Sequence, residues 1–266
     1  EEKELHFFSG QWYRGRRWYA RHFAGAADRG LVCGEITPYY LFHPFCAERI
    51  HALLPGVKLV VLLRNPVHRA VSHYFHAVER GFEKRPLGEA LALEEARLAG
   101  TEEELRSPAG SSFDHQKLSF FHRGLYKEQL DRYFQRFPKE NILLLRSEDL
   151  FLHPAETLAT ILDFIGAPGN VGQSGLRPGG HGGQAINDQQ QRPPEAPHEN
   201  RGAYSLVGDV DPGVLKDLTE RFRGPNAELK RAYGVSWGQD DDDDGGCQQE
   251  VITHADKAKK KGGKGV

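Results

Sequence analysis

Residues 64–72 combine side chains that suit the binding of an anionic group. Arg64 ends an unbroken apolar run, and Ser72 lies eight residues later, off the apolar face of a helix-like pattern. Arginine offers a planar fork of donors that matches a phosphate dianion, and the free N–H groups of a helix N-terminus add to such a site. From these residues alone, an equally good interpretation is that Arg64 pairs with a neighbouring carboxylate and Ser72 faces solvent.

The elements that must position these side chains are a strand and the helix after it. Leu59 to Leu63 shows no polar alternation, which is typical of a strand buried on both faces of a parallel sheet. Asn65 is a good N-cap, and Pro66 fits the first helical position. We therefore predict an α/β fold with a parallel sheet flanked by helices, in which 141–145 forms another buried strand.

The segment RNPVHRAVSHY, residues 64–74, resembles the 3′-phosphate-binding segment of the sulfotransferases, R-[DN]-P-x-x-R-[AV]-x-S. The resemblance implies that Arg64 and Ser72 hold the 3′-phosphate of 3′-phosphoadenylyl sulfate, the sulfuryl donor, and that no metal is required. It extends over roughly residues 3–165 and 200–237. It also implies the P-loop-NTPase-like fold of that family.

The first residues, K-E-x-H-F-F at 3–8, form a second segment of interest. By residue type this is an edge strand or a helix entry with a solvated Glu4. The pattern is also similar to a motif of glycan sulfotransferases, especially the heparan sulfate group and its bacterial relatives. That resemblance implies that Glu4 is the general base on the acceptor, with Lys3 and His6 as acceptor contacts. Desolvation beside the aromatic pair would raise the pKa of the Glu4 carboxyl towards a useful range.

Two further segments resemble the family less closely. Glu35 begins E-I-T-P-Y-Y, similar to the family's E-K-[ST]-P-x-Y, and is a substrate-binding candidate; a turn carboxylate is an equally good interpretation. Ile36 stands where many relatives carry a lysine that helps to bind substrate and sulfate. The loop that closes over the nucleotide in relatives maps loosely onto Arg201, Gly202, Ala203 and Tyr204, which we predict to bind the donor.

One family motif does not occur in the sequence. Sulfotransferases carry a K-x-G-T-[ST] loop after their first strand, which cradles the 5′-phosphosulfate, and this chain contains no such segment. Because residues 3–8 already match the family segment that comes after that loop, we expect an N-terminally truncated domain that lacks the first strand and the phosphosulfate loop. Such a fragment should bind the nucleotide poorly and catalyse little or no transfer.

Composition sets the domain boundaries and the classes of partner. Residues 1–237 are expected to form a partial sulfotransferase domain with an irregular insertion at 166–199, and 238–266 a disordered low-complexity tail. With 35 basic and 37 acidic side chains, nothing argues for nucleic acid. No stretch of the sequence approaches a transmembrane span, so membrane association, or a Golgi location in a eukaryote, would need a segment outside this sequence.

Three local predictions concern packing. Residues 31–35 are predicted to form a short strand, with Cys33 as a buried small hydrophobe. Residues 86–106 are predicted to form an acidic amphipathic helix, or a pair of helices, with a solvated face that includes Glu94 and Glu95.

The main functional hypothesis is therefore a sulfotransferase that moves a sulfuryl group from 3′-phosphoadenylyl sulfate to a hydroxyl or amine of a saccharide. An inactive sulfotransferase-like module that binds a nucleotide or a glycan is the alternative. A P-loop-type kinase is a third hypothesis, but it needs a Walker lysine and Mg²⁺ ligands, neither of which is visible in the sequence.

Overall fold

The computed structural model describes residues 4–26, 29–167 and 210–238. Its helices are α1 (Phe7–Gly10), α2 (Gly15–Arg21), α3 (Tyr39–Phe42), α4 (Cys46–Leu53), α5 (Pro66–Glu79), α6 (Leu87–Leu98), α7 (Thr101–Arg106), α8 (Phe113–Lys117), α9 (Tyr126–Phe134), α10 (Ser147–Leu152), α11 (Pro154–Ile165) and α13 (Pro212–Tyr233), with 3₁₀ turns η1 (Trp12–Arg14), η3 (His122–Gly124) and η4 (Lys139–Asn141). The predicted insertion and tail lie almost entirely outside the described residues.

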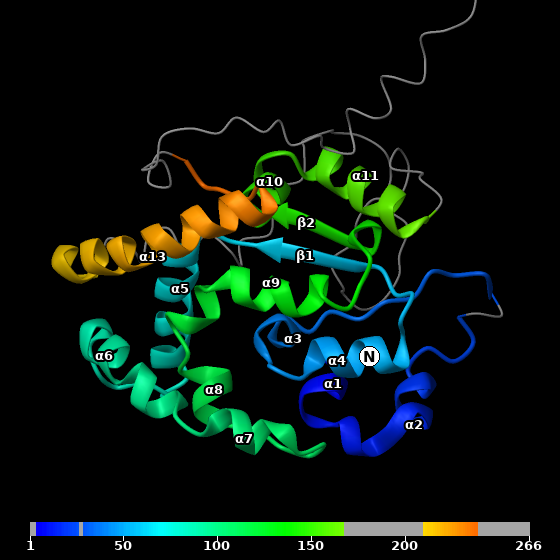
Figure 1. The fold of residues 1–266 in the computed structure, drawn as a ribbon, viewed down its shortest axis with the longest axis horizontal. Helices are drawn as coiled ribbons and strands as arrows, with labels where there is room; N and C mark the ends of the chain where they lie inside the picture. The colour runs from blue at the N-terminus through cyan, green and yellow to red at the C-terminus, as the bar shows by residue number, and fades with distance from the viewer. Residues whose placement is uncertain (1–3, 27–28, 168–209, 239–266) are drawn as a thin grey trace, which may run out of the picture.

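The two strands of the described sheet are parallel. β1 (Leu59–Leu63) pairs with β2 (Ile142–Arg146) from Leu59 opposite Ile142 to Leu63 opposite Arg146. Figure 1 shows the strands in the middle of the molecule, with α9 on one side and α10 and α11 on the other. The carboxyl ends of both strands therefore meet at the same edge of the sheet, where ligands bind in open α/β folds.

The predicted strand, turn and helix are present at 59–79. The Asn65 side chain accepts hydrogen bonds from the backbone N–H groups of Val67 (3.0 Å) and His68 (3.2 Å), and Pro66 is the first residue of α5. One expectation fails: Leu62 is 43% exposed, so β1 is not buried on both faces along its whole length, because no described element covers that side chain.

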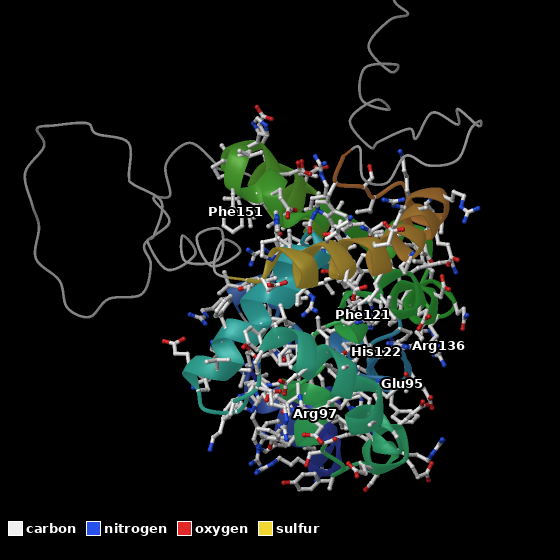
Figure 2. The ribbon with its side chains drawn as sticks, turned by 90° about the vertical axis from the view of Figure 1, so that its left-hand side faces the viewer. Glu95, Arg97, Phe121, His122, Arg136 and Phe151 are labelled. Atoms are coloured by element: carbon white, nitrogen blue, oxygen red, sulfur yellow. The ribbon has the colours of Figure 1, made fainter. Side chains whose placement is uncertain are left out.

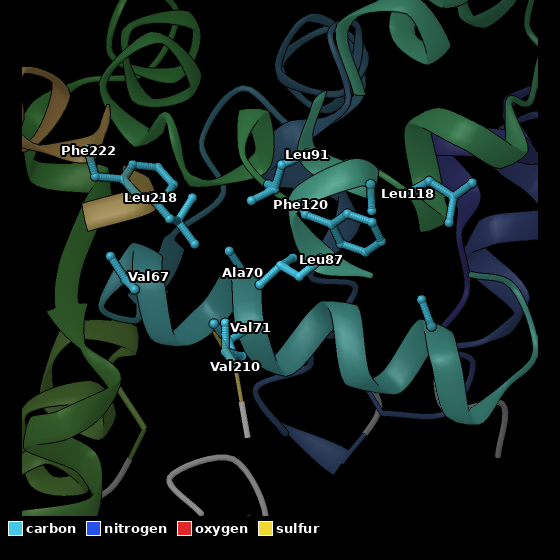
Figure 3. Packing of buried hydrophobic residues seen from close by; sticks show 12 residues of the cluster. Val67, Ala70, Val71, Leu87, Leu91, Leu118, Phe120, Val210, Leu218 and Phe222 are labelled. Carbon is cyan, nitrogen blue, oxygen red and sulfur yellow. The ribbon is translucent and has the colours of Figure 1, made fainter. Parts of the chain in front are cut away.

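Helix α5 packs its apolar face into the largest cluster of buried side chains. Figure 3 shows Val67, Ala70 and Val71 of α5 against Phe120 and against Leu218 and Phe222 of α13. Helix α13 contacts both α5 and α9 (Figure 1). Helices α5 and α13 therefore stabilise each other's positions. This packing determines how the outer face of α5 is presented.

A second cluster is aromatic and holds the N-terminal segment. Phe7 and Phe8 of α1 are fully buried against Trp12, Tyr19 and Tyr40. The Arg49 guanidinium of α4 donates to the Phe8 carbonyl oxygen at 2.8 Å. These contacts fix α1 and, with it, the residues just before it.

The predictions for residues 31–35 are wrong. This segment forms no strand; Leu31 and Val32 are each about half exposed, and Cys33 is exposed rather than buried. The apolar composition of the segment indicated a strand, but no neighbouring strand of the described chain pairs with it. Within the described ranges, no helix is long and apolar enough to cross a membrane.

The prediction for residues 86–106 is correct in its elements and wrong for one residue. The segment forms a pair of helices, α6 and α7, and Glu95 is exposed as expected. Glu94 is instead 1% exposed, because its carboxylate turns inward to accept hydrogen bonds from the backbone of Phe121 and His122.

Candidate active site

The segment predicted to bind phosphate lies where β1 ends and α5 begins. Arg64 follows the last residue of β1, and His68 and Ser72 lie four residues apart on one side of α5. Burial, followed by the positive charge of Arg64, lowers the pKa of His68. The Tyr126 hydroxyl donates to the Arg64 carbonyl oxygen at 2.8 Å, which fixes the backbone from which the Arg64 side chain departs.

Glu148 ties this turn to the rest of the fold. Its Oε1 accepts from the Asn65 backbone N–H at 2.9 Å, and its Oε2 accepts from the Trp237 indole Nε1 at 3.0 Å. Glu148 lies just beyond β2, in the segment that resembles the family's E-D-L. A single carboxylate thus joins the ends of both strands and the segment after α13.

Glu4 and His6 form the second part of the site. His6 Nε2 lies 3.2 Å from Glu4 Oε2, and His6 Nδ1 lies 3.1 Å from the Ser9 hydroxyl. Burial lowers the pKa of His6, so a neutral imidazole donates from one nitrogen to the carboxylate. His6 has a φ of 49°, in the left-handed region, which is uncommon for a residue other than glycine and is often found at functional sites.

The Glu4 side chain is 41% exposed, and this corrects one expectation. Phe7 and Phe8 turn inward into the aromatic cluster and do not cover the carboxylate. The predicted desolvation of Glu4 by the aromatic pair is therefore wrong. The carboxylate instead faces solvent, with His6 fixing its orientation.

Glu35 lies near this pair. Its Oε2 accepts from the Tyr40 hydroxyl at 3.1 Å and from the Thr37 hydroxyl at 3.3 Å, while its Oε1 is buried with no hydrogen-bond partner among the described residues. Its negative charge acts on His6. The structure thus brings Glu35, His6 and Glu4 together, whereas Lys3 and Arg201, Gly202, Ala203 and Tyr204 lie outside the described residues.

Arg123 interacts electrostatically with residues of both parts of the candidate site, and the sequence analysis does not select it. Its guanidinium stacks over the rings of Tyr39 (5.1 Å to the centroid) and Phe42 (5.7 Å), and it interacts electrostatically with Glu4 and Tyr126. Tyr126 in turn bonds to Arg64. Arg123 begins the segment RGLY, whose pattern indicates no more than the start of a helix.

A cavity of about 140 Å³ opens beside His6. Its walls are formed by His6, Ser9, Gly10, Tyr39, Leu105, Ser111, Ser112 and Gln116. Hydroxyl, amide and imidazole groups make up much of this lining, and such groups suit a ligand that is rich in hydroxyls. Within the described part of the chain, no group of three or more His, Cys, Asp or Glu side chains is arranged to hold a metal ion.

Comparison with known proteins finds similarity to sulfotransferases. A family model for the sulfotransferase domain matches residues 47–175. Human heparan sulfate glucosamine 3-O-sulfotransferase 6 is 31% identical over 163 residues, which cover 61% of this chain and 43% of the human protein. The membrane-associated sulfotransferase kil1 of Dictyostelium discoideum is 24% identical over 232 residues, covering 62% of this chain and 49% of that protein.

A solved structure agrees with these matches. The crystal structure of a sulfotransferase from Alicyclobacillus acidocaldarius superposes with a TM-score of 0.61 at 24% identity, covering 89% of this chain and 85% of that one. The fold is therefore the predicted one, an α/β fold with a parallel sheet flanked by helices, of the P-loop-like type that sulfotransferases share. The chain is therefore similar to sulfotransferases over residues 47–175 and in its fold. It spans less than half of the human relative.

Proposed function

We propose that this protein transfers a sulfuryl group from 3′-phosphoadenylyl sulfate to a hydroxyl or amine of a saccharide. The observation that carries the proposal is the segment from Arg64 to Ser72, at the carboxyl end of β1 and inside the region that matches the family model. The acceptor class is supported by relatives whose names include heparan sulfate.

The donor is held through its 3′-phosphate. The Arg64 guanidinium and the Ser72 hydroxyl bind the phosphate oxygens, and the first N–H groups of α5 favour negative charge at the same place. Losing one such charge-assisted bond costs roughly 1.5–3 kcal/mol, or about tenfold to a hundredfold in affinity. Arg201, Gly202, Ala203 and Tyr204 are proposed to close over the nucleotide.

Glu4 removes the proton from the acceptor as its oxygen or nitrogen attacks the sulfur in line. His6 holds the Glu4 carboxylate through the 3.2 Å contact, and Lys3 and Glu35 contact the acceptor. The solvent-exposed position of Glu4 leaves its carboxylate accessible to an incoming hydroxyl. General-base catalysis of this kind contributes typically a factor of about 10²–10⁴ in rate.

In sulfotransferases the 5′-phosphosulfate is held by the K-x-G-T-[ST] loop and not by the 3′-phosphate segment. The sequence contains no K-x-G-T-[ST] segment, so we propose that this chain alone holds the nucleotide mainly through its 3′-phosphate. The second candidate function is an inactive sulfotransferase-like module that binds a nucleotide or a glycan. The two candidates share the Arg64 site and differ in whether sulfuryl transfer occurs.

A nucleotide titration tests the shared site. Binding of 3′-phosphoadenosine 5′-phosphate and of adenosine 5′-phosphate would be measured by calorimetry on the wild-type chain and on Arg64→Ala. We expect tighter binding of the 3′-phosphorylated nucleotide to the wild type, and a loss of roughly tenfold or more of that preference in the variant. Equal affinity for the two nucleotides in the wild type would contradict the 3′-phosphate site.

A transfer assay separates enzyme from binding module. Radiolabelled 3′-phosphoadenylyl sulfate would be incubated with heparan sulfate and with either the wild type or Glu4→Gln. Labelled saccharide that disappears in Glu4→Gln, while nucleotide affinity stays unchanged, supports the enzyme with Glu4 as base. Because this chain contains no K-x-G-T-[ST] segment, nucleotide binding without transfer favours the binding module only in a protein that carries that loop.

A further inference from the structure

Arg123 is a partly buried cation without a counter-charge in direct contact. Its guanidinium makes no hydrogen bond or ion pair with any residue in the described ranges, and its contacts are the faces of Tyr39 and Phe42. Burial, followed by the nearby charge of Arg69, lowers the pKa of Arg123 to about 10. A cation removed from water without a partner is unfavourable, and such groups are usually paired or bind a ligand.

The backbone around Arg123 is held firmly. The Gln129 side-chain amide donates to the carbonyl oxygens of Arg123 (3.0 Å), Leu125 (3.1 Å) and His122 (3.3 Å). The buried Glu94 carboxylate accepts from the N–H groups of Phe121 and His122 on the other side. Arg123 is therefore presented in a fixed position, which reduces the entropy lost when a ligand binds.

Two other arginines, Arg69 and Arg132, have hydrogen-bond acceptors for their guanidinium groups. Arg69 donates to the Phe120 carbonyl oxygen, and the Arg132 guanidinium donates to the Leu41 and Phe42 carbonyl oxygens. Arg123 has no such acceptor among the described residues, and the carboxylate that acts on it electrostatically is that of Glu4. Its stacking partner Tyr39 also lines the cavity beside His6. Arg123 is therefore linked to the cavity through its contact with Tyr39 and to Glu4 through an electrostatic interaction.

We propose that Arg123 binds an anionic group of the saccharide acceptor, a sulfate or a carboxylate, and so selects acidic saccharides over neutral ones. The identification of the ligand as the acceptor rests on the function proposed above, whereas the anion site itself rests on the contacts of Arg123. A guanidinium fork matches both groups, and stacking on two aromatic faces leaves its edge N–H groups available.

Direct binding tests the proposal without requiring catalysis. The probes are a sulfated tetrasaccharide prepared from heparan sulfate and its desulfated, carboxyl-reduced, N-acetylated neutral counterpart. The variants are Arg123→Gln, Arg123→Lys and a matched control, Lys58→Gln. Lys58 is also a cation over an aromatic ring (Phe164, 5.4 Å), but it lies at the amino end of β1, the opposite end of the strand from Arg64. Thermal melting of each variant checks that it folds.

We expect Arg123→Gln to weaken binding of the sulfated tetrasaccharide at least tenfold, and Lys58→Gln to weaken it less than twofold. Arg123→Lys should recover part of the loss, because it keeps the charge without the fork. Affinity for the neutral tetrasaccharide and for 3′-phosphoadenosine 5′-phosphate should not change. Unaltered binding of the sulfated probe by Arg123→Gln, or no binding of it by the wild type, would overturn the proposal.

Two other outcomes separate this inference from the proposed function. If Arg123→Gln weakens the nucleotide as much as the saccharide, Arg123 belongs to the donor site and the inference is wrong, while the proposed function stands. If the wild type binds no nucleotide but binds the sulfated tetrasaccharide through Arg123, the anion site stands and the proposed function fails.

Discussion

The Glu94 carboxylate holds the backbone of residues 121 and 122 in place. It is 1% exposed and accepts hydrogen bonds from the N–H groups of Phe121 (2.7 Å) and His122 (2.8 Å) and from His122 Nδ1 (2.9 Å). Figure 2 shows Phe121 and His122 close to each other and near Glu95, which belongs to α6. A buried acceptor with three donors determines the position of Arg123, one residue further along the chain.

We predict that Glu94→Gln lowers the free energy of unfolding by about 2–3 kcal/mol, because the amide replaces one charged acceptor with a donor that faces N–H groups. The neighbouring Glu95 is exposed, so Glu95→Gln should change the free energy of unfolding by less than about 0.5 kcal/mol. Urea denaturation monitored by circular dichroism measures both. Equal stability of the two variants would contradict the assigned role of Glu94.

A single residue, His115, also makes the free energy of unfolding depend on pH. Burial, with the charges of Arg123 and Arg132, lowers the pKa of His115 to about 3. Because this pKa lies below the unfolded value of about 6.5, the unfolded state binds the proton more strongly, and stability present above pH 6.5 is lost as the pH falls. Each such histidine contributes up to about 1.4 kcal/mol per pH unit in this window.

We therefore predict that His115→Gln reduces the slope of unfolding free energy against pH, between pH 6 and pH 4.5, by about 1 kcal/mol per unit. Urea denaturation at a series of pH values measures the slope. His76→Gln, at an exposed position of α5, is the control and should leave it unaltered. A wild-type slope of zero in this range would show that His115 is not held in its neutral form.

At the scale of elements, β1, its turn and α5 could be predicted from the sequence because their determinants are local. The apolar run, the Asn65 cap and Pro66 act over a few residues, and the structure contains each of them. The segment 31–35 could not be predicted in the same way, since strand formation requires a partner strand that short-range patterns do not identify. The burial of Glu94 likewise depends on Phe121 and His122, which are distant in sequence.

The cap can be tested directly. Asn65→Ala should lower the free energy of unfolding by about 1 kcal/mol, because the N–H groups of Val67 and His68 lose their acceptor. Asn65→Asp keeps an acceptor and should retain most of the stability. Thermal unfolding compares the three proteins, and equal losses in both variants would contradict a capping role.

At the scale of the whole molecule, the site is assembled from segments that lie far apart in the chain. Glu4 and His6 come from the start, Arg64 from the end of β1, Arg123 from η3, and Trp237 from beyond α13. Motif resemblance indicates Glu4 and Arg64 as candidates because each lies in a recognisable segment. Motif resemblance could not select Arg123. This residue is a candidate because it stacks on Tyr39 and Phe42 and has no hydrogen-bond acceptor among the described residues, and these contacts depend on the tertiary structure.

The contact between Trp237 and Glu148 is the link that joins the C-terminal segment to this assembly. Trp237→Phe removes a hydrogen bond to a carboxylate and should lower the free energy of unfolding by about 1.5–3 kcal/mol. We also expect weaker binding of 3′-phosphoadenosine 5′-phosphate, because Glu148 holds the Asn65 N–H beside Arg64. Calorimetry and urea denaturation measure the two effects. A destabilised variant with wild-type nucleotide affinity would show that the link serves folding alone.

The positions of the tryptophans allow ligand binding to be followed by intrinsic fluorescence. The sequence has three tryptophans: Trp12 and Trp18 pack in the aromatic cluster with Phe7, and Trp237 donates a hydrogen bond to Glu148, which also binds the Asn65 N–H beside Arg64. A Trp12→Phe, Trp18→Phe protein would report emission from the donor side alone. Trp237→Phe would report emission from the acceptor side. The order in which nucleotide and saccharide arrive could then be followed by stopped-flow fluorescence without any attached dye.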